Sequence, residues 1–246
     1  MLSALGRTIL DLLYPKTCPF CGEYIGGEVA AMEHTDWICP ECWLRLPRTE
    51  QDMLRENSTE MVLTQGGSMV ANKKQMRLER AAAYLFYRKG HAIQEVIHLM
   101  KYRDMPELGW WMAEQAVLDL HNEHFFDGID LIMPMPLHPK RMSERGYNQS
   151  EYIARGLSGI TGIPVDTEHL VRCKNTPKQA LQDAEGRKTN VADAFAVLHP
   201  EQVYHKHILL VDDLITTGET VKACLHAMKA FRGARFSVFA LCKAVR

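Results

Sequence analysis

The chain has 246 residues, of which 46% are apolar, and this is enough to bury one large hydrophobic core beside a small second module. Its formal net charge of −1 gives no overall field that would attract nucleic acid or an anionic membrane surface. No apolar run approaches the length that spans a bilayer, so we expect no membrane insertion.

Residues 1–14 carry leucine and isoleucine side chains at helical spacing. Asp11 interrupts this apolar pattern and no small-residue cleavage site follows, which argues against a signal peptide. We therefore predict a packing helix at this end and a cytoplasmic location.

Two Cys-x-x-Cys pairs come next, separated by 17 residues, a spacing that is typical of tetrahedral zinc. Four sulfur ligands leave no open coordination position, so we predict a structural Zn²⁺ rather than a catalytic one. The alternatives are unliganded thiols or disulfides, and disulfides need an oxidising compartment. The predicted ligands are Cys18, Cys21, Cys39 and Cys42.

Residues 1–48 are therefore predicted to form a zinc module. Its Trp37 and Trp43 either pack around the metal core or offer stacking surfaces to single-stranded bases. Residues 49–80 are polar, lack clear periodicity and contain Gly66-Gly67, so we interpret them as a connector.

From residue 81 to residue 246, apolar runs of strand length alternate with segments of helical periodicity. This alternation predicts an α/β fold with a doubly wound, mostly parallel sheet. His205 and His207, beside the strand that starts at 208, are expected to face solvent. The predicted strands are 81–87, 128–136, 163–165, 170–171, 208–211 and 236–241, and the predicted helices are 92–101, 108–120, 150–157 and 220–231.

Residues 134–149 combine three prolines with a concentration of positive charge, just beyond the carboxyl end of a predicted strand. Ligands of open α/β sheets bind beyond these strand ends. A stiff basic loop suits a pyrophosphate, because arginine offers bidentate contacts to it. The alternative is a solvated basic turn. The residues assigned to pyrophosphate in this loop are Lys140, Arg141 and Arg145.

The most specific segment begins with the apolar run 208–211, which leads into Asp212 and Asp213. Paired carboxylates repel phosphate, but they suit the hydroxyls of a ribose and a divalent cation. Neighbouring strand residues point to opposite faces, so both acids reach one ribose only if the strand ends there. The structural alternative is a strand–loop–helix unit with incidental acids.

A turn rich in hydroxyl groups and glycine follows the acids and enters a predicted helix. Free backbone N–H groups and the dipole at a helix start attract a phosphate. The chain has no Gly-x-x-x-x-Gly-Lys-Ser/Thr motif, which argues against a P-loop nucleotidase. Only 33 residues follow Asp213, too few for a receiver domain. The segment therefore predicts a site for a phosphorylated ribose.

Two acids followed by Thr-Thr-Gly-x-Thr resemble the PRPP-binding loop of type I phosphoribosyltransferases. The resemblance implies that Asp212 and Asp213 are the catalytic residues, hydrogen-bonded to the ribose hydroxyls, and that PRPP binds with Mg²⁺. It also implies a fold of the type I phosphoribosyltransferase kind. The 5′-phosphate site implied by the resemblance consists of Thr216, Thr217, Gly218, Glu219 and Thr220.

The order of the zinc knuckles, the Pro-x-Pro-Leu-x-x-x-Arg-x-x-x-Arg-Gly-Tyr-Asn-Gln segment and the acidic loop resembles the ComF competence proteins. The likeness covers nearly the whole chain except residues 49–80. It includes the Lys101-Tyr102 pair, and it implies that Lys101 is a further residue that binds pyrophosphate. Gln179 and Arg187 are carried over as members of a mobile loop that closes over PRPP. The family is implicated in DNA uptake, with single-stranded DNA or a DNA helicase as implied partners.

Three hypotheses follow. The first is a PRPP- and magnesium-dependent phosphoribosyltransferase whose acceptor the motifs do not define. The second is a non-catalytic competence factor that senses PRPP and binds single-stranded DNA or a helicase. The third is a nucleobase salvage enzyme, although no base-reading residues can be named in the sequence.

Overall fold

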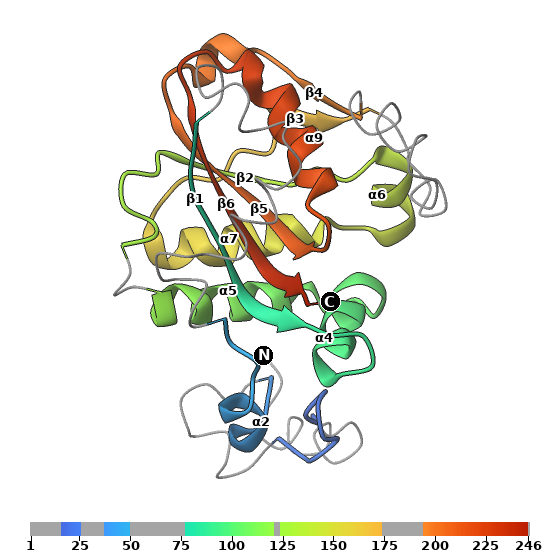
Figure 1. Ribbon diagram of the computed structural model, residues 1–246. Helices are drawn as coiled ribbons and strands as arrows, with labels where there is room; N and C mark the ends of the chain where they lie inside the picture. Colours follow the sequence, from blue (N-terminus) through green and yellow to red (C-terminus); the bar gives the residue numbers. More distant parts are fainter. Residues whose placement is uncertain (1–15, 26–36, 50–76, 121–123, 174–193, 246) are drawn as a thin grey trace, which may run out of the picture.

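The computed structural model describes residues 16–25, 37–49, 77–120, 124–173 and 194–245 (Figure 1). Its centre is a four-stranded sheet in the order β1-β6-β5-β2, in which every neighbouring pair is parallel. The strands are β1 Arg77–Tyr87, β2 Leu131–Pro134, β5 His207–Ile215 and β6 Arg235–Ala244.

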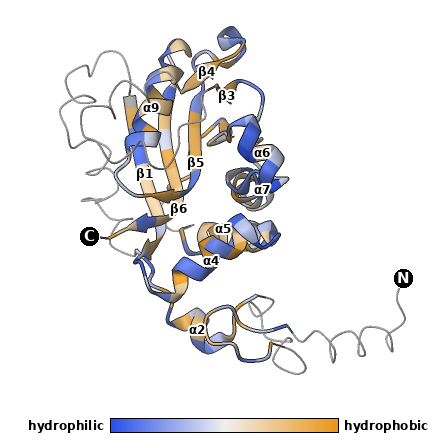
Figure 2. Cartoon of the chain, turned by 90° about the vertical axis from the view of Figure 1, so that its right-hand side faces the viewer, coloured by the Kyte–Doolittle hydropathy of each residue, from blue (hydrophilic) through white to orange (hydrophobic). Residues whose placement is uncertain are grey.

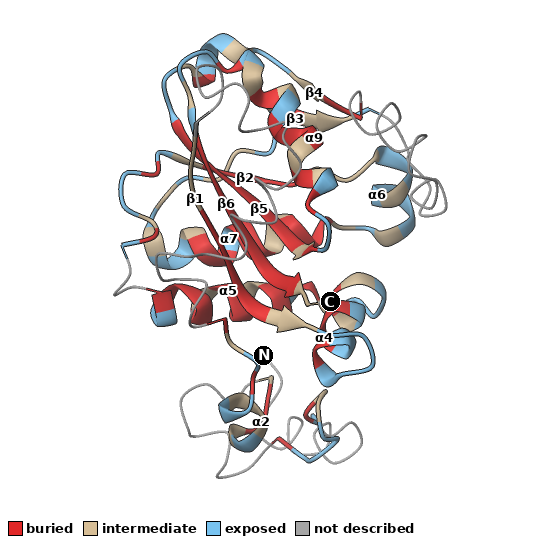
Figure 3. Cartoon of the chain, viewed as in Figure 1, coloured by how far each residue is buried: buried red, intermediate tan, exposed pale blue. Residues whose placement is uncertain are grey.

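Helices cover both faces of this sheet, three on one face and one on the other (Figure 2). Along β5, Leu209 and Val211 pack into the core on the three-helix face, whereas Ile208 and Leu210 pack into the core on the other face. The continuous apolar run of this strand is needed because both of its faces are buried (Figure 3). The predicted doubly wound, mostly parallel fold is therefore confirmed. The helices are α4 Ala92–Tyr102, α5 Pro106–Leu120 and α7 Gln149–Thr161 on the first face, and α9 Glu219–Ala227 on the second.

Two of the predicted short strands do not join the parallel sheet. Residues 170–171 lie in β3 (Leu170–Arg172), which pairs antiparallel with β4 (Phe195–Val197) in a separate two-stranded sheet. Residues 163–165 form no strand and contribute one isolated parallel bridge, between Val165 and Ile132. Apolar runs this short carry no signal that distinguishes membership of the main sheet from a satellite hairpin.

The basic segment after β2 was predicted to be a loop, and this is wrong, because part of it is the helix α6 (Pro139–Arg145). The His138 side chain accepts a hydrogen bond from the backbone N–H of Lys140 at 3.2 Å and so caps the helix start. Pro139 occupies the first turn, where its missing N–H costs nothing. Gly146 ends the helix with φ 83°, a left-handed conformation that favours glycine.

Three strands of the main sheet extend beyond the predicted bounds, and one of them is β6, which covers Arg235–Ala244 against the predicted 236–241. β1 begins at Arg77, four residues before the predicted start, and β5 continues past the acidic pair to Ile215. Residues 50–76 and most of the N-terminal segment lie outside the described residues, as does the predicted helix 1–14. The division of the chain at residues 48 and 80 therefore stays a prediction.

The cysteine-rich module lies below α4 and α5 in Figure 1 and packs against the main domain. Trp43 contacts Trp111 of α5 with ring centroids 5.2 Å apart, and the Arg48 guanidinium lies over the Trp43 ring at 4.5 Å. The backbone N–H of buried Thr49 donates to the carbonyl of Tyr84 in β1 at 3.0 Å. Trp43 is thus a packing residue at this junction, the first of the two interpretations.

The expectation that His207 faces solvent is wrong, whereas His205 is exposed as predicted. The His207 ring is buried and its nitrogens lie 3.0 Å from the carbonyl oxygen of Gly128 and 2.9 Å from Ser237 Oγ. Burial, reinforced by the nearby Arg235, lowers the pKa of His207. This histidine therefore ties β5 to β6 and to the residues before β2.

In the part of the chain that the structure describes, no helix combines the length and apolar character needed to cross a bilayer.

The crossing of α5 and α7 depends on Gly156, and this generates a test of the packing. A Cβ atom at Gly156 would overlap the backbone carbonyl oxygen of Trp110 and come within 3.0 Å of Ala113 Cβ. We expect Gly156→Ala to lower the free energy of unfolding by about 1–3 kcal/mol, measured by urea denaturation, because helix backbones cannot yield easily.

Gly159 on the same helix provides the matched control, since it is exposed and its added Cβ would meet nothing closer than 3.8 Å. Gly159→Ala should be neutral or stabilising by up to about 1 kcal/mol, the difference in helix propensity. Equal effects of the two substitutions would contradict the described helix crossing.

Candidate functional site

A cavity of about 620 Å³ opens at the carboxyl ends of β2 and β5. Parallel strands that end together leave an open crevice there, which is where open α/β sheets bind ligands. Its wall combines the end of α4, helix α6, the start of α7, β3, β5 and α9. The charged and polar side chains that line it belong to Lys101, Tyr102, Asp104, Arg141, Glu144, Arg145, Gln149, Ser150, Arg172, Asp212, Asp213 and Thr220.

Asp212 and Asp213 form the floor of this cavity and are 9% and 4% exposed. The strand does not end before them, yet both line the same cavity. The Asp212 carboxylate turns toward the next residue, where its Oδ1 accepts a hydrogen bond from the backbone N–H of Asp213 at 2.9 Å. The Ser150 hydroxyl donates to the same oxygen at 3.3 Å. These two contacts fix the direction of Asp212.

Lys101, from the last turn of α4, forms an ion pair with Asp213. Burial opposes ionisation of Asp213, but the adjacent Lys101 ammonium outweighs it and lowers the pKa of that carboxyl. In the same way, burial disfavours the charged form of Lys101, but Asp213 outweighs it and raises the pKa of the ammonium. Burial and the neighbouring Asp213 raise the pKa of Asp212 to about 8. The surroundings therefore favour ionisation of Asp213 and disfavour ionisation of Asp212.

Of the five residues assigned to a 5′-phosphate, Thr220 lines the cavity. Gly218 is buried with φ 76° at the start of α9, a backbone conformation that favours glycine. Thr216, Thr217 and Glu219 are exposed, and Glu219 pairs with Lys222 at 3.2 Å. The start of α9 is thus presented toward the cavity by a tight turn, and the side chains of the turn point largely to solvent.

Of the basic residues predicted to bind pyrophosphate on α6, some line the cavity and one does not. Arg141 and Arg145 of α6 line the cavity, whereas Lys140 is exposed and is not among the lining residues. The Arg145 guanidinium lies 5.5 Å from the centre of the Tyr102 ring and donates a hydrogen bond to the Gln149 side chain. Helical spacing explains the division, since residues 141 and 145 are one turn apart and share a face.

Arg172 was not assigned to the site from the sequence, although it lines the cavity from β3. Its guanidinium lies 5.3 Å from the Phe195 ring centre on the neighbouring strand. Burial, together with the nearby Arg141, lowers the pKa of Arg172. Gln149 and Ser150 were also missed, and the sequence offered one signal for them, since Gln149 ends the basic segment 134–149 and Ser150 begins the predicted helix that follows it. Gln179 and Arg187 lie outside the described residues.

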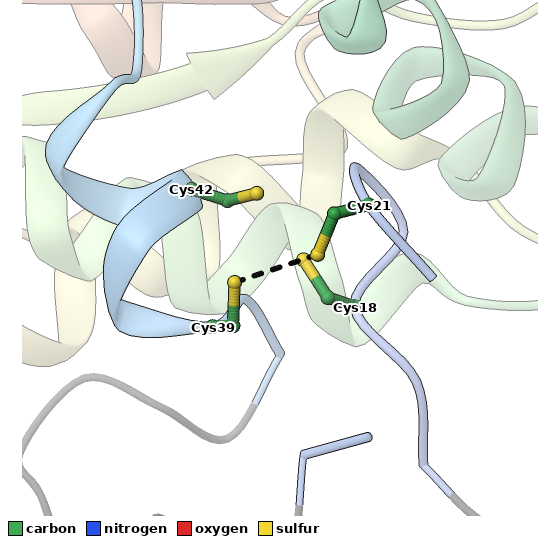
Figure 4. Close-up of side chains that lie close together, drawn as sticks. All are labelled: Cys18, Cys21, Cys39 and Cys42. Carbon is green, nitrogen blue, oxygen red and sulfur yellow. Dashed lines mark hydrogen bonds between the residues drawn. The ribbon is translucent and has the colours of Figure 1, made fainter. Parts of the chain in front are cut away.

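The four predicted zinc ligands come together in the cysteine-rich module (Figure 4). Their sulfur atoms all lie within 4.8 Å of one another, and Sγ of Cys21 is 3.6 Å from Sγ of Cys39. Sulfurs placed tetrahedrally at about 2.3 Å from a zinc ion are about 3.8 Å apart, so the cluster fits this metal. Cys39 precedes the short helix α2 (Pro40–Leu44), which carries Cys42 one turn later. Burial raises the pKa of the Cys42 thiol, so metal binding must release a proton there.

Residues 9–53 match the double zinc ribbon domain family. Only four cysteines fall within this segment of the sequence, which is enough for one site with four thiolates. The match and the cysteine cluster together support a structural zinc and confirm the predicted nature of the module.

The DNA utilization protein YhgH of Escherichia coli K12 is 29% identical to this chain over 154 residues, which cover 61% of this chain and 67% of that protein. Competence protein F of Haemophilus influenzae is 30% identical over 130 residues, which cover 52% of this chain and 57% of that protein. The resemblance to the ComF competence proteins expected from the motifs is confirmed by these relatives.

Among solved structures, HGPRT-ase from Leishmania tarentolae in complex with GMP is similar to 55% of this chain and 66% of that chain, with 19% identity and a TM-score of 0.26. A likeness of this strength identifies no activity.

The cysteine cluster predicts one zinc ion per chain. We expect Cys39→Ser to lose the ion, because three thiolates and a hydroxyl hold zinc far more weakly than four thiolates. Elemental analysis of the purified protein measures the result. Cys173→Ser, which changes an exposed cysteine of the main domain, should retain one zinc ion, and loss of zinc from both variants would contradict the assignment.

The raised pKa of Asp212 predicts a pH-dependent stability. A carboxyl group with a higher pKa in the folded state contributes its full stability below the unfolded value of 3.8 and loses it as the pH rises toward about 8. Asp212→Asn has no carboxyl group to ionise at this position, so it does not lose stability in this way as the pH rises. The melting temperature of the variant should therefore rise relative to wild type between pH 6 and pH 9, by at least about 2 °C per kcal/mol recovered.

Glu107→Gln is the control for this titration, because Glu107 is exposed. Its melting temperature should follow that of the wild type across the same range. A constant difference between Asp212→Asn and wild type would show that Asp212 is ionised in the folded protein throughout.

Proposed function

We propose that this chain, a relative of the ComF competence proteins, is a phosphoribosyltransferase-type protein that binds PRPP with Mg²⁺ in the cytoplasm and serves the uptake or use of DNA. The observation that carries the proposal is the single cavity at the strand ends, where two buried acids, the start of α9 and a group of basic side chains meet. A ribose, a 5′-phosphate and a pyrophosphate require these three kinds of partner.

The acids suit the pentose part of the ligand. Ionised Asp213 accepts hydrogen bonds from a sugar hydroxyl, and Asp212, held by Ser150 and a backbone N–H, offers its second oxygen. The carboxylate oxygens are also the donors that Mg²⁺ prefers, so Asp212 and Asp213 are the residues that would hold the ion. A bound Mg²⁺ would supply neutralisation of charge on the pyrophosphate.

The basic residues suit the leaving group. Arg141 and Arg145 project from one face of α6, and Arg172 faces the cavity from β3. Guanidinium groups bind phosphate oxygens in bidentate fashion and stabilise the charge that develops as pyrophosphate departs. Breakage of the bond between C1 and pyrophosphate leaves positive charge on the ribose, and a carboxylate beneath the sugar stabilises that charge.

The role in DNA uptake or use is supported by the names of the relatives, one a DNA utilization protein and the other a competence protein. Trp43 is half-buried and packs against Trp111 and Arg48, which favours a packing role over base stacking. The part of the zinc module that contains Trp43 therefore attaches the module to the main domain. The residues proposed to bind the ligand lie in the cavity at the strand ends.

Calorimetric titration of PRPP into the zinc-loaded protein, with and without Mg²⁺, tests the proposal. We expect binding that depends on Mg²⁺ and that Asp213→Asn weakens at least about tenfold, since a lost charged hydrogen bond costs about 1.5–3 kcal/mol. Asp127→Asn should bind as the wild type does. Absence of heat on addition of PRPP in both conditions would reject the PRPP site.

Turnover is measured separately, as pyrophosphate released when PRPP and a panel of acceptors are mixed with the protein. Release with free bases would support the salvage hypothesis, and release with another acceptor would support the transferase. Binding of PRPP without any release would support the sensing hypothesis.

A further inference from the structure

Lys101 occupies an unusual position for a residue expected to contact pyrophosphate. Its side chain is 20% exposed and pairs with Asp213, whose side chain is 6% exposed. The ammonium therefore lies against the acidic pair in the same cavity that Arg145 of α6 lines.

The end of α4 that carries Lys101 is held by the residues around α6. The Tyr147 hydroxyl donates to the carbonyl oxygen of Met100 at 2.8 Å, and the Arg145 guanidinium lies over the Tyr102 ring. Both neighbours of Lys101 in the sequence are thus tied to the segment 145–147. These contacts fix the start of the lysine side chain, so the ammonium reaches Asp213 from a rigid base.

The two acids of the cavity already have partners, which disfavours the binding of a free cation to them. Lys101 Nζ forms an ion pair with Asp213 Oδ2, and Asp212 Oδ1 accepts two hydrogen bonds from the protein. A divalent ion would bind the same two carboxyl groups, and it would be repelled by an ammonium within ion-pair distance of Asp213. The two cations therefore compete for one acidic pair.

We infer that Lys101 is a built-in counter-ion, a positioning residue that takes the place of a divalent metal beside Asp213 and prevents the metal from binding on its own. The metal then enters together with the phosphorylated sugar, whose anionic groups bring further ligands for it. This second step rests on the proposed function, and the exclusion of the bare metal does not. The inference also moves Lys101 from the pyrophosphate group to the acidic pair.

The test uses Mn²⁺ as the probe, added without PRPP to the zinc-loaded full chain and followed by electron paramagnetic resonance of the free ion. Wild type should bind Mn²⁺ weakly, whereas Lys101→Met should bind one ion at least about tenfold more tightly, because the carboxylates lose their competitor. Lys101→Arg keeps the charge and should bind as weakly as wild type. Lys206→Met, an exposed lysine at the opposite end of β5, controls for the loss of one positive charge.

Removal of Lys101 leaves Asp213 buried without its counter-ion, so folding is followed by circular dichroism in the same samples. The double variant Lys101→Met with Asp213→Asn removes both charges, should fold, and should lose the tighter Mn²⁺ binding. Wild type that already binds Mn²⁺ as tightly as Lys101→Met would overturn the inference, as would tighter binding that persists in the double variant. Should Lys101→Met fail to fold while the double variant folds, tight Mn²⁺ binding to Lys101→Gln supports the inference and weak binding overturns it.

The outcome is separable from that of the proposed function. Failure of PRPP to bind rejects the phosphoribosyl site and leaves the Mn²⁺ comparison valid. Unchanged Mn²⁺ affinity in Lys101→Met, with normal PRPP binding, rejects the counter-ion role alone.

Discussion

Two neighbouring carboxyl groups buried at the end of a central strand are the constraint on which this structure depends. Taking a carboxylate out of water is costly unless a charge or hydrogen bonds compensate it. Here Lys101 compensates Asp213, and a backbone N–H and Ser150 hold Asp212. These partners come from α4, β5 itself and α7, so three elements must meet at one point before the acids can be buried.

The basic helix α6 is positioned by contacts beside the same acids. α7 begins at Gln149 with Asn148 as its cap, and the Asn148 amide also donates to the carbonyl of Met135 at 3.1 Å. The start of α7 is therefore tied to the end of β2, and the short helix α6 is fixed between them. Arg141 and Arg145 of this helix line the cavity. A basic helix held at both ends presents its charges more rigidly than a loop would.

The fold was largely predictable because its elements are long and strongly patterned. The apolar positions of α4, Ile93, Val96, Ile97 and Met100, recur at helical spacing and are all buried. By contrast α6 was missed, since the three prolines of residues 134–149 were interpreted as stiffening a loop, although a proline in the first turn and a glycine after the last turn, here Pro139 and Gly146, also mark helix boundaries. His207 was misassigned because its burial depends on Gly128 and Ser237, which are far away in the sequence.

The sequence by itself determined the chemistry of this protein: four cysteines spaced for one metal, an apolar strand leading into two acids, and a basic segment after another strand. Each of these features consists of residues that are close together in the sequence, so it can be recognised without the fold. Only the tertiary structure decided which charges meet, because Lys101 and Asp213 are brought together by the packing of α4 against the sheet, and Arg172 reaches the cavity from a separate hairpin. The strength of an interaction between two charges depends on their distance in space, and the spacing of residues along the chain does not specify this distance.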